Sequence, residues 1–266
     1  MTDKVWLDGR IVPAKNAAIA PNDRGFLLGD GLFETMRLTE GSVPHLQRHL
    51  SRLETGCATL YLRCPDRALL QKAVADLIVA TGLQSGSMRL TVTRGSGPRG
   101  LLPPVDVTPT ILLTCATSSS PSMQPVRLAT SRYVRDGASP LSRVKSLNYL
   151  PMVMARMEAV AAGYDDALLP GKGGVVAEAS AANILLLLKG ELVTPPVMDG
   201  ALPGTSRARL LEGGLCREQS VPLNAWSQVA SAWLISALSL QPVASVDSFT
   251  FREEPAWEEK LRAFLF

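Results

Sequence analysis

The stretch SRVKSLNYLPMVMARMEA, residues 142–159, decides how the fold of this chain is interpreted. A helix is predicted over 148–162, because apolar residues recur at three- and four-residue steps and form one stripe. Either Ser146 or Asn148 is predicted to cap its first turn. The members of the apolar stripe are Leu150, Val153, Met154 and Met157.

Lys145 lies just ahead of this predicted helix, where the helix dipole is positive and a cation is disfavoured. One interpretation is that the amine is neutral and reactive. The other is an ordinary solvated lysine on the surface. The stretch alone leaves both open.

The sequence before this stretch predicts a mixed portion of helices and strands. The segment 45–60 is amphipathic, and the segment 66–81 is predicted as a helix between a capping Asp66 and a terminating Gly82. Strands are predicted over 4–14, 31–44, 87–95 and 108–116, the first as a hairpin around an Asp-Gly turn.

A polar, proline-bearing segment, TSSSPSMQP at 117–125, is the best linker candidate. Strands and helices resume after it, including a helix predicted over 205–212. The run AANILLLL is predicted as a buried strand. We therefore expect an α+β protein with largely antiparallel sheets. Its predicted parts are an N-terminal domain of residues 1–116, a linker of 117–125 and a C-terminal domain of 126–266.

The composition excludes several classes of protein. Of the 266 residues, 46% are hydrophobic and 19% are charged, which excludes intrinsic disorder as the main state. The formal net charge is +3 and the cations are scattered, so no nucleic-acid partner is expected. The N-terminus is too charged for a signal peptide, and the longest apolar run is too short to cross a bilayer. We expect a soluble cytoplasmic protein with no membrane partner.

Cysteines and histidines give no metal signal. The cysteines at 57, 64, 115 and 216 form no Cys-x-x-Cys pair, so neither a disulfide framework nor a zinc site is indicated. His45 and His49 are four residues apart on a predicted helix, but they are the only two histidines and no third ligand is suggested. No metal is predicted.

Three segments could hold an anion. Gly204 and Thr205 precede a predicted helix, where free N–H groups and a capping hydroxyl suit phosphate. Ser236 lies at a strand end, and Arg52 lies on the first predicted helix, where its planar fork could bind phosphate through two hydrogen bonds. Each has an ordinary alternative: a simple turn, a polar strand end or a solvated helix face.

Glu178 stands between a glycine-rich turn and the most apolar strand, so its carboxylate must be paired or exposed. A protonated ring nitrogen would be one partner, and Asn183 could brace the loop. A lysine, a carboxylate for a ring nitrogen and three phosphate-holding elements are together what pyridoxal phosphate requires.

The same segments resemble the class IV aminotransferase family, the fold type IV pyridoxal-phosphate enzymes. Six motifs occur in the family's order over nearly the whole chain. They are DRGFLLGDGLFETMR from residue 23, HLSRLE from 49, KSLNYLPMVMARMEA from 145, VAEASAANI from 176, LPGTSR from 202 and SALSLQPV from 236. The resemblance implies a two-domain α+β fold of the D-amino acid aminotransferase type.

The resemblance also assigns roles to individual residues. Lys145 would form the Schiff base with pyridoxal 5'-phosphate and then move the substrate proton. Glu178 would face the pyridine nitrogen, and Arg52 would bind the phosphate. The other residues assigned to the cofactor are Tyr149, Asn183, Gly204, Thr205, Ser236 and Ala237.

Two reactions fit the family, and the substrate pocket distinguishes them. Thr35 falls where aminodeoxychorismate lyases often carry threonine and branched-chain aminotransferases usually carry glycine, so it is expected to be catalytic. TRGSGPRGLLPP, from residue 93, is similar to the lyases' Arg-Gly-x-Gly-x-Arg-Gly stretch. We therefore expect a 4-amino-4-deoxychorismate lyase that releases 4-aminobenzoate and pyruvate.

Other features favour an amino-acid aminotransferase acting on branched-chain or D-amino acids. Many lyases carry Arg where Tyr149 stands, and Leu101 replaces a tyrosine or histidine that contacts substrate. Arg99 fits both interpretations. In the family this position can bind a substrate carboxylate from the neighbouring subunit, which implies a homodimer. Phe33 completes the expected substrate-binding set. A third hypothesis, a binding protein without activity, is disfavoured because Lys145 and Glu178 are both present.

Overall fold

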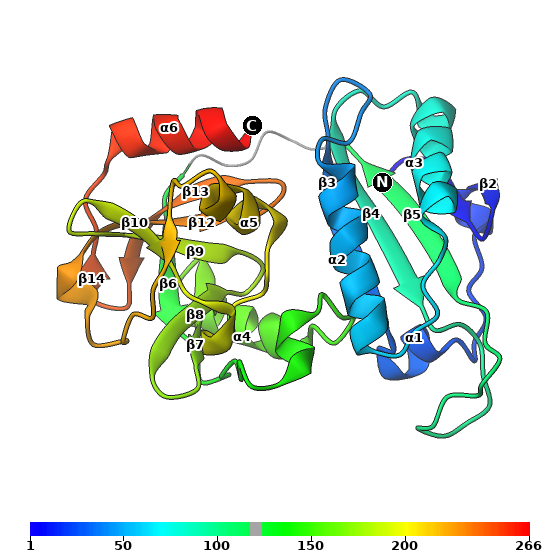
Figure 1. The fold of residues 1–266 in the computed structure, drawn as a ribbon, viewed down its shortest axis with the longest axis horizontal. Coiled ribbons are helices and arrows are strands. Elements are labelled where there is room, and N and C mark those ends of the chain that lie inside the picture. Colours follow the sequence, from blue (N-terminus) through cyan, green and yellow to red (C-terminus); the bar gives the residue numbers. More distant parts are fainter. Residues whose placement is uncertain (118–123) are drawn as a thin grey trace. The chain divides into compact units, whose positions relative to one another are not determined.

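The computed structural model describes residues 1–117 and 124–266, which form two compact units (Figure 1). Of the described residues, unit 1 contains 1–117 and Val144–Asn148, and unit 2 contains 124–143 and Tyr149–Phe266. Most of the expected linker, residues 118–123, lies outside the described residues. The division of the predicted domains therefore stays a prediction at that point.

Unit 1 is built on one antiparallel sheet with the strand order β2-β1-β5-β4-β3. The register places each residue of β3 opposite one of β4, from Gly31 opposite Thr93 to Leu38 opposite Gly86. The bounds of the strands are β1 Lys4–Leu7, β2 Arg10–Pro13, β3 Gly31–Leu38, β4 Gly86–Thr93 and β5 Thr110–Ala116.

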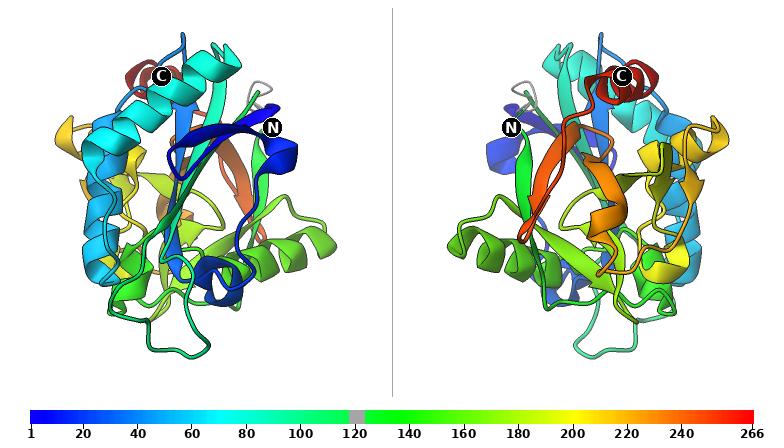
Figure 2. Two further views of the ribbon diagram at one scale, coloured as in Figure 1. Left: turned by 90° about the vertical axis from the view of Figure 1, so that its right-hand side faces the viewer. Right: turned by 90° about the vertical axis from the view of Figure 1, so that its left-hand side faces the viewer.

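Two helices cover one face of this sheet (Figures 1 and 2). They are α2, Leu46–Thr59, and α3, Arg67–Thr81, as the sequence predicts. The Asp66 side chain caps α3 by accepting a hydrogen bond from the Leu69 N–H, and Gly82 ends it in the left-handed conformation with φ 63°. The sequence analysis did not identify the short helix α1, Arg24–Leu28, whose N-cap is Asp23.

The segment Val144–Asn148 belongs to unit 1, so the prediction that residues 126–266 form one continuous domain is wrong at this point. The Phe33 N–H donates to the Lys145 carbonyl at 2.9 Å, and the Leu147 N–H donates to the Gly31 carbonyl at 3.0 Å. The segment thus lies along β3 and extends the sheet at that edge.

Unit 2 contains a nine-stranded sheet that closes on itself, because β8 pairs with both β7 and β9. The sheet is mixed rather than largely antiparallel, since β6 pairs in parallel with both β7 and β13. Its strands are β6 Val126–Thr130, β7 Asp166–Gly171, β8 Val175–Ala179, β9 Asn183–Leu188, β10 Glu191–Thr194, β11 Arg217–Glu218, β12 Val229–Ile235, β13 Leu240–Val246 and β14 Phe249–Thr250.

Three α-helices belong to unit 2: α4 Leu150–Ala161, α5 Thr205–Glu212 and α6 Pro255–Leu265. The prediction for α4 is wrong in two respects. The helix begins at Leu150 and carries Pro151 in its first turn, where the missing N–H costs no helical hydrogen bond, and Tyr149 is the N-cap without a side-chain cap. Its buried residues are Met152, Ala155 and Ala159, whereas Leu150, Val153 and Met157 of the predicted stripe are exposed.

In the described parts of the chain, no helix combines the length and apolar character needed to cross a membrane. The cytoplasmic location stays a prediction.

Candidate functional site

Lys145 is held at the edge of the unit 1 sheet, beside β3. The bond from the Phe33 N–H to the Lys145 carbonyl and the bond from the Leu147 N–H to the Gly31 carbonyl fix the main chain here. Ser146 pairs with Leu32 in an isolated antiparallel bridge. This placement does not come from a helix N-terminus, because α4 begins five residues later in the sequence.

The Phe33 ring contacts two cations. The Lys145 Nζ is 4.4 Å and the Arg89 guanidinium carbon 3.7 Å from its centroid. A cation over an aromatic face is attracted by the ring quadrupole, so these contacts hold both side chains in place. Phe33 is 6% exposed although it lies on the sheet face opposite the helices.

Strand β3 alternates between a core face and this open face, as a period of two requires. Thr35 stands directly opposite Arg89, and Arg37 stands opposite Ser87. The open face therefore carries a hydroxyl and two guanidinium groups, of which Arg89 contacts the same ring as Lys145. Arg89 and Arg37 were missed in the sequence. The alternation in SMRLTVTRG places Arg89 out of phase with the apolar residues, but its partner depends on a register that the sequence does not give.

Arg52 binds a buried carboxylate on the core side of β3. Its Nε donates to Glu34 Oε1 at 2.8 Å, and its Nη2 donates to Glu34 Oε2 at 2.5 Å. His49 Nδ1 lies 2.7 Å from the same Oε2. Burial would raise the pKa of Glu34, but Arg52 and His49 outweigh it and lower the pKa below its usual value. The phosphate-binding role of Arg52 stays a prediction.

Glu178 lies on β8, is 6% exposed and contacts Arg135 and Leu202 of unit 2. Arg135 Nε is 2.9 Å from its Oε1, and the Leu202 N–H donates to Oε2 at 2.8 Å. Arg135 also donates to the carbonyls of Gly200 and Ser142. The Arg135 guanidinium and the Leu202 N–H thus orient the buried carboxylate, which suits it to hold a protonated ring nitrogen.

Asn183, which pairs with Glu178 between β9 and β8, braces the turn before α5. Its Nδ2 donates to the Leu202 carbonyl at 2.9 Å. A Cβ added to Gly204 would lie 2.0 Å from the Asn183 Oδ1, so glycine allows this close approach. The expected capping hydroxyl of Thr205 is wrong: Gly204 is the N-cap, and no described side chain caps the helix there.

The second expected phosphate turn lies against the first. Ser206 donates its hydroxyl hydrogen to the Ser236 carbonyl at 2.8 Å. Ser236 Oγ in turn accepts from the N–H groups of Leu238 and Ser239, which follow Ala237, both at 3.1 Å. Unit 2 thus brings together a helix N-terminus, a hydroxyl-rich turn and a buried carboxylate. These groups fit the phosphate and the ring nitrogen of pyridoxal phosphate.

Three further predicted site residues lie on other segments of the chain than the groups described above. Tyr149 is the N-cap of α4 and packs at the edge of a small apolar cluster in unit 2. Arg99 is exposed in the loop between β4 and β5, and Leu101 in the same loop is 83% exposed. Their contact with a substrate stays a prediction.

Among residues 1–117 and 124–266, no group of three or more His, Cys, Asp or Glu side chains could hold a metal ion. The four cysteines, at 57, 64, 115 and 216, are free.

Comparison with known proteins identifies this arrangement. The family model for amino-transferase class IV matches residues 31–246. A protein of Methanocaldococcus jannaschii, provisionally named a branched-chain-amino-acid aminotransferase, is 34% identical over 228 residues, which cover 82% of this chain and 76% of that protein. A D-alanine aminotransferase of Bacillus licheniformis is 27% identical over 219 residues, again covering 82% of this chain and 76% of the relative.

A solved structure is also similar over almost its full length. The 4-amino-4-deoxychorismate lyase of Pseudomonas aeruginosa superposes with a TM-score of 0.85 at 32% identity. The match covers 97% of this chain and 98% of the lyase.

Proposed function

Because this chain belongs to the class IV aminotransferase family and has the α+β fold of its type IV enzymes, we propose that it is a 4-amino-4-deoxychorismate lyase. The family uses pyridoxal 5'-phosphate. This cofactor withdraws electrons from the substrate carbon that bears the amino group.

The observation that carries the proposal is the open face of β3 and β4. Thr35, the residue type typical of the lyases at this position, stands opposite Arg89 and two residues from Phe33 and its Lys145 contact. The substrate carries two carboxylates, and the Arg89 guanidinium on this face suits one of them.

In this proposal Lys145 is the general base that removes the proton from the carbon bearing the amino group. The bond between the neighbouring ring carbon and the ether oxygen then breaks, its electron pair leaves with the oxygen as enolpyruvate, and the ring becomes aromatic. The enolpyruvate takes up a proton at its methylene carbon and is released as pyruvate. Thr35 donates a hydrogen bond to the leaving oxygen. Arg89, and Arg99 from the neighbouring subunit, bind the carboxylates.

In unit 2, Glu178 would hold the cofactor ring nitrogen, with Arg135 keeping its carboxylate oriented. The turns at Gly204 and Ser236, linked by Ser206, would bind the phosphate with Arg52. Asn183 keeps the first of these turns in place.

The alternative is an amino-acid aminotransferase, which exchanges an amino group with a 2-oxo acid. The named sequence relatives favour it, as does Tyr149 where many lyases carry Arg. Arg37 and Arg89 would then bind the carboxylates of the amino-acid and 2-oxo-acid substrates.

The decisive experiment supplies the purified holoenzyme with chorismate, glutamine and the upstream synthase, and measures 4-aminobenzoate. Parallel assays supply D-alanine, L-leucine or L-glutamate with 2-oxoglutarate. We expect 4-aminobenzoate and slow amino-group exchange. Rapid exchange without 4-aminobenzoate would establish the aminotransferase instead.

A lysine variant tests the site itself. Lys145→Ala should lose the visible absorbance of bound cofactor and reduce turnover by about 10²- to 10⁴-fold. Lys172→Ala, which removes an exposed lysine paired with Asp136, should keep both. Normal turnover in Lys145→Ala would contradict the proposal.

A homodimer is part of this proposal, since Arg99 is proposed to serve the neighbouring subunit. Exposed apolar side chains lie near Arg99 in unit 1, on the short helix α1 and in the same loop. They are Phe26, Leu27, Leu101 and Leu102. A second copy would cover them.

A further inference from the structure

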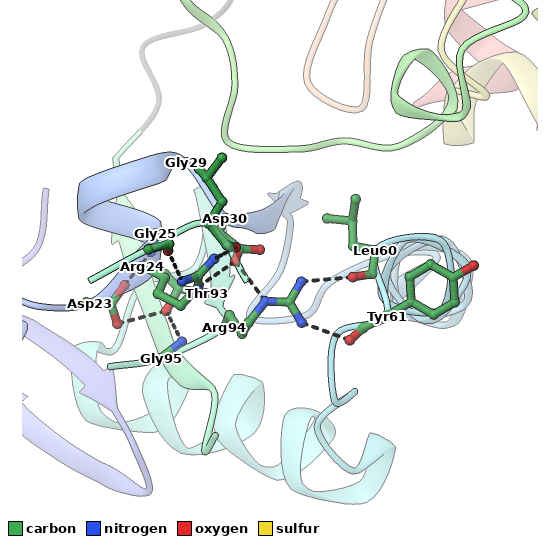
Figure 3. A network of polar contacts seen from close by, with 12 residues as sticks. Asp23, Arg24, Gly25, Gly29, Asp30, Leu60, Tyr61, Thr93, Arg94 and Gly95 are labelled. Carbon is green, nitrogen blue, oxygen red and sulfur yellow. Dashed lines mark hydrogen bonds and ion pairs between the residues drawn. The ribbon is translucent and has the colours of Figure 1, made fainter. Parts of the chain in front are cut away.

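Arg24, which is buried, and Arg94, which is partly buried, share one carboxylate in unit 1 (Figure 3). Arg24, at the start of α1, donates from Nε to Asp30 Oδ2 at 2.9 Å, and Arg94, just after β4, donates from Nε to the same oxygen at 2.8 Å. Burial would raise the pKa of Asp30, but Arg94 and Arg24 outweigh it and lower the pKa. Asp30 therefore stays ionised and fixes the plane of both guanidinium groups.

Each arginine uses its remaining nitrogens to hold two successive carbonyls, but in different loops. Arg24 donates from Nη1 to Gly100 at 2.9 Å and from Nη2 to Leu101 at 2.7 Å. Arg94 donates from Nη1 to Tyr61 and from Nη2 to Leu60, both at 2.8 Å. The two side chains are thus equivalent in construction and differ in the loop that they hold.

The loop held by Arg24 is the one that carries Arg99. Its base is fixed to the start of α1 and to the residues just before it: the Arg24 N–H donates to the Gly95 carbonyl at 2.9 Å, and the Gly97 N–H donates to the Asn22 carbonyl at 3.2 Å. Its far side is fixed by the Arg24 side chain at Gly100. Arg99 therefore lies between two attachments made by one short segment.

Side-chain burial adds little to the order of this loop. Leu101 is 83% and Leu102 is 88% exposed, whereas Arg24 is 3% exposed. Charge-assisted hydrogen bonds from a buried guanidinium to main-chain carbonyls are therefore the main fixed contacts of the Gly100–Leu101 turn.

Asp23, next to Arg24, fixes the start of α1 to the sheet. Its Oδ2 accepts from the hydroxyls of Thr93 at 2.8 Å and Thr110 at 2.7 Å, and its Oδ1 accepts from the Gly25 N–H at 2.8 Å. These bonds fix the start of α1 to the ends of β4 and β5, between which the loop runs.

We propose that Arg24 is a positioning residue that sets the conformation of the 95–101 loop and thereby the orientation of the Arg99 side chain. This inference rests on the proposed function only in that Arg99 binds a substrate carboxylate. The same buried arginine would then determine how tightly a carboxylate substrate binds, without touching it.

Trypsin provides a test that does not depend on activity. The bonds Arg99–Gly100 and Arg63–Cys64 lie in the two loops that Arg24 and Arg94 hold, and trypsin can cleave both. We expect native holoenzyme with Arg24→Gln to be cleaved after Arg99 at least about tenfold faster than wild type. Arg94→Gln should instead accelerate cleavage after Arg63. Each variant is the matched control for the other, because both lose one bond to Asp30.

Kinetics test the consequence for substrate. Arg24→Gln should raise KM for the carboxylate substrate by about tenfold to a hundredfold, with a smaller change in kcat. Arg94→Gln should leave KM close to the wild-type value. Arg24→Lys, which keeps the charge beside Asp30 but cannot reach both carbonyls, should resemble Arg24→Gln. It also provides the measurement if the glutamine variant does not fold.

The Arg99→Gln variant separates failure of this inference from failure of the proposed function. If Arg99→Gln raises KM, the double variant with Arg24→Gln should raise it no further. Unchanged cleavage after Arg99 in both Arg24 variants would overturn the inference, as would an unchanged KM in them while Arg99→Gln raises it. If Arg99→Gln leaves KM unchanged, the proposed substrate role of Arg99 is wrong, and accelerated cleavage after Arg99 still supports the positioning of the loop by Arg24.

Discussion

At the scale of single residues, Glu34 joins α2 to β3 through Arg52 and His49. Glu34→Gln leaves these two basic groups buried without their carboxylate. We expect it to lower the free energy of unfolding at neutral pH by about 3–5 kcal/mol. Glu191→Gln, at an exposed ion pair with Arg217, should cost less than about 1 kcal/mol.

The pH dependence of this loss follows from the lowered pKa of Glu34. A carboxylate whose pKa is lower in the folded than in the unfolded protein stabilises the fold at pH values above the ordinary pKa, which is 4.5 for this group. That contribution is lost as the pH falls through the folded-state pKa. The difference between wild type and Glu34→Gln should therefore shrink below pH 4.5. Urea denaturation at a series of pH values measures it, and a constant difference would contradict the ion pair.

A substitution of Glu178 tests the role of the other buried carboxylate. Glu178→Gln keeps the shape of the side chain but removes the charge that pairs with Arg135 and is proposed to hold the ring nitrogen. We expect kcat to fall by about 10²- to 10³-fold and the absorbance of the bound cofactor to shift. The ion pair between Glu158 and Arg132 offers a control. Glu158→Gln should change neither kcat nor the cofactor absorbance. A wild-type kcat in Glu178→Gln would show that the carboxylate has no role in turnover.

At the scale of elements, the sequence predicted those helices whose ends have local causes. The bounds of α3 follow from Asp66 and Gly82, which act within one turn of the chain. The start and buried face of α4 could not be predicted in this way. Its tightly packed residues include two alanines, Ala155 and Ala159, which a hydrophobic stripe analysis ranks below the larger exposed Met157.

Gly204, at the start of α5, allows a prediction about the effect of adding a side chain there. A Cβ in Gly204→Ala would lie against the Asn183 Oδ1 and force this side chain away from its bond to the Leu202 carbonyl. The turn would move, so we expect cofactor affinity to fall by about tenfold or more. Titration of the apoprotein with pyridoxal phosphate measures this, with the melting temperature as a control for global unfolding. Wild-type affinity would show that the turn does not contact the cofactor.

At the scale of the whole molecule, the order of most helices and strands could be predicted, but the partition of the chain could not, and the roles of Lys145 and Glu178 stay predictions. Val144–Asn148 returns to unit 1 because its backbone pairs with β3. Pairing across more than a hundred residues leaves no local signal. The same limit hid Arg89, whose place beside Phe33 depends on the register of β3 and β4.

The proposed homodimer makes a prediction for the exposed apolar side chains of α1 and the 95–101 loop region. Phe26 is 77% and Leu102 is 88% exposed, and Arg24 ties α1 to this loop through Gly100 and Leu101. A second copy that receives Arg99 would cover both side chains, so Phe26→Asp or Leu102→Asp would bury a charge in the interface.

We expect each of these variants to raise the dimer dissociation constant by at least about tenfold, as measured by sedimentation equilibrium. Val79→Asp is the matched control, because Val79 is 82% exposed on α3 and lies outside this region. Its substitution should leave association unchanged. If the Phe26 and Leu102 variants associate as wild type does, a second copy does not cover this region, and Arg99 could serve a neighbouring subunit only from a different interface.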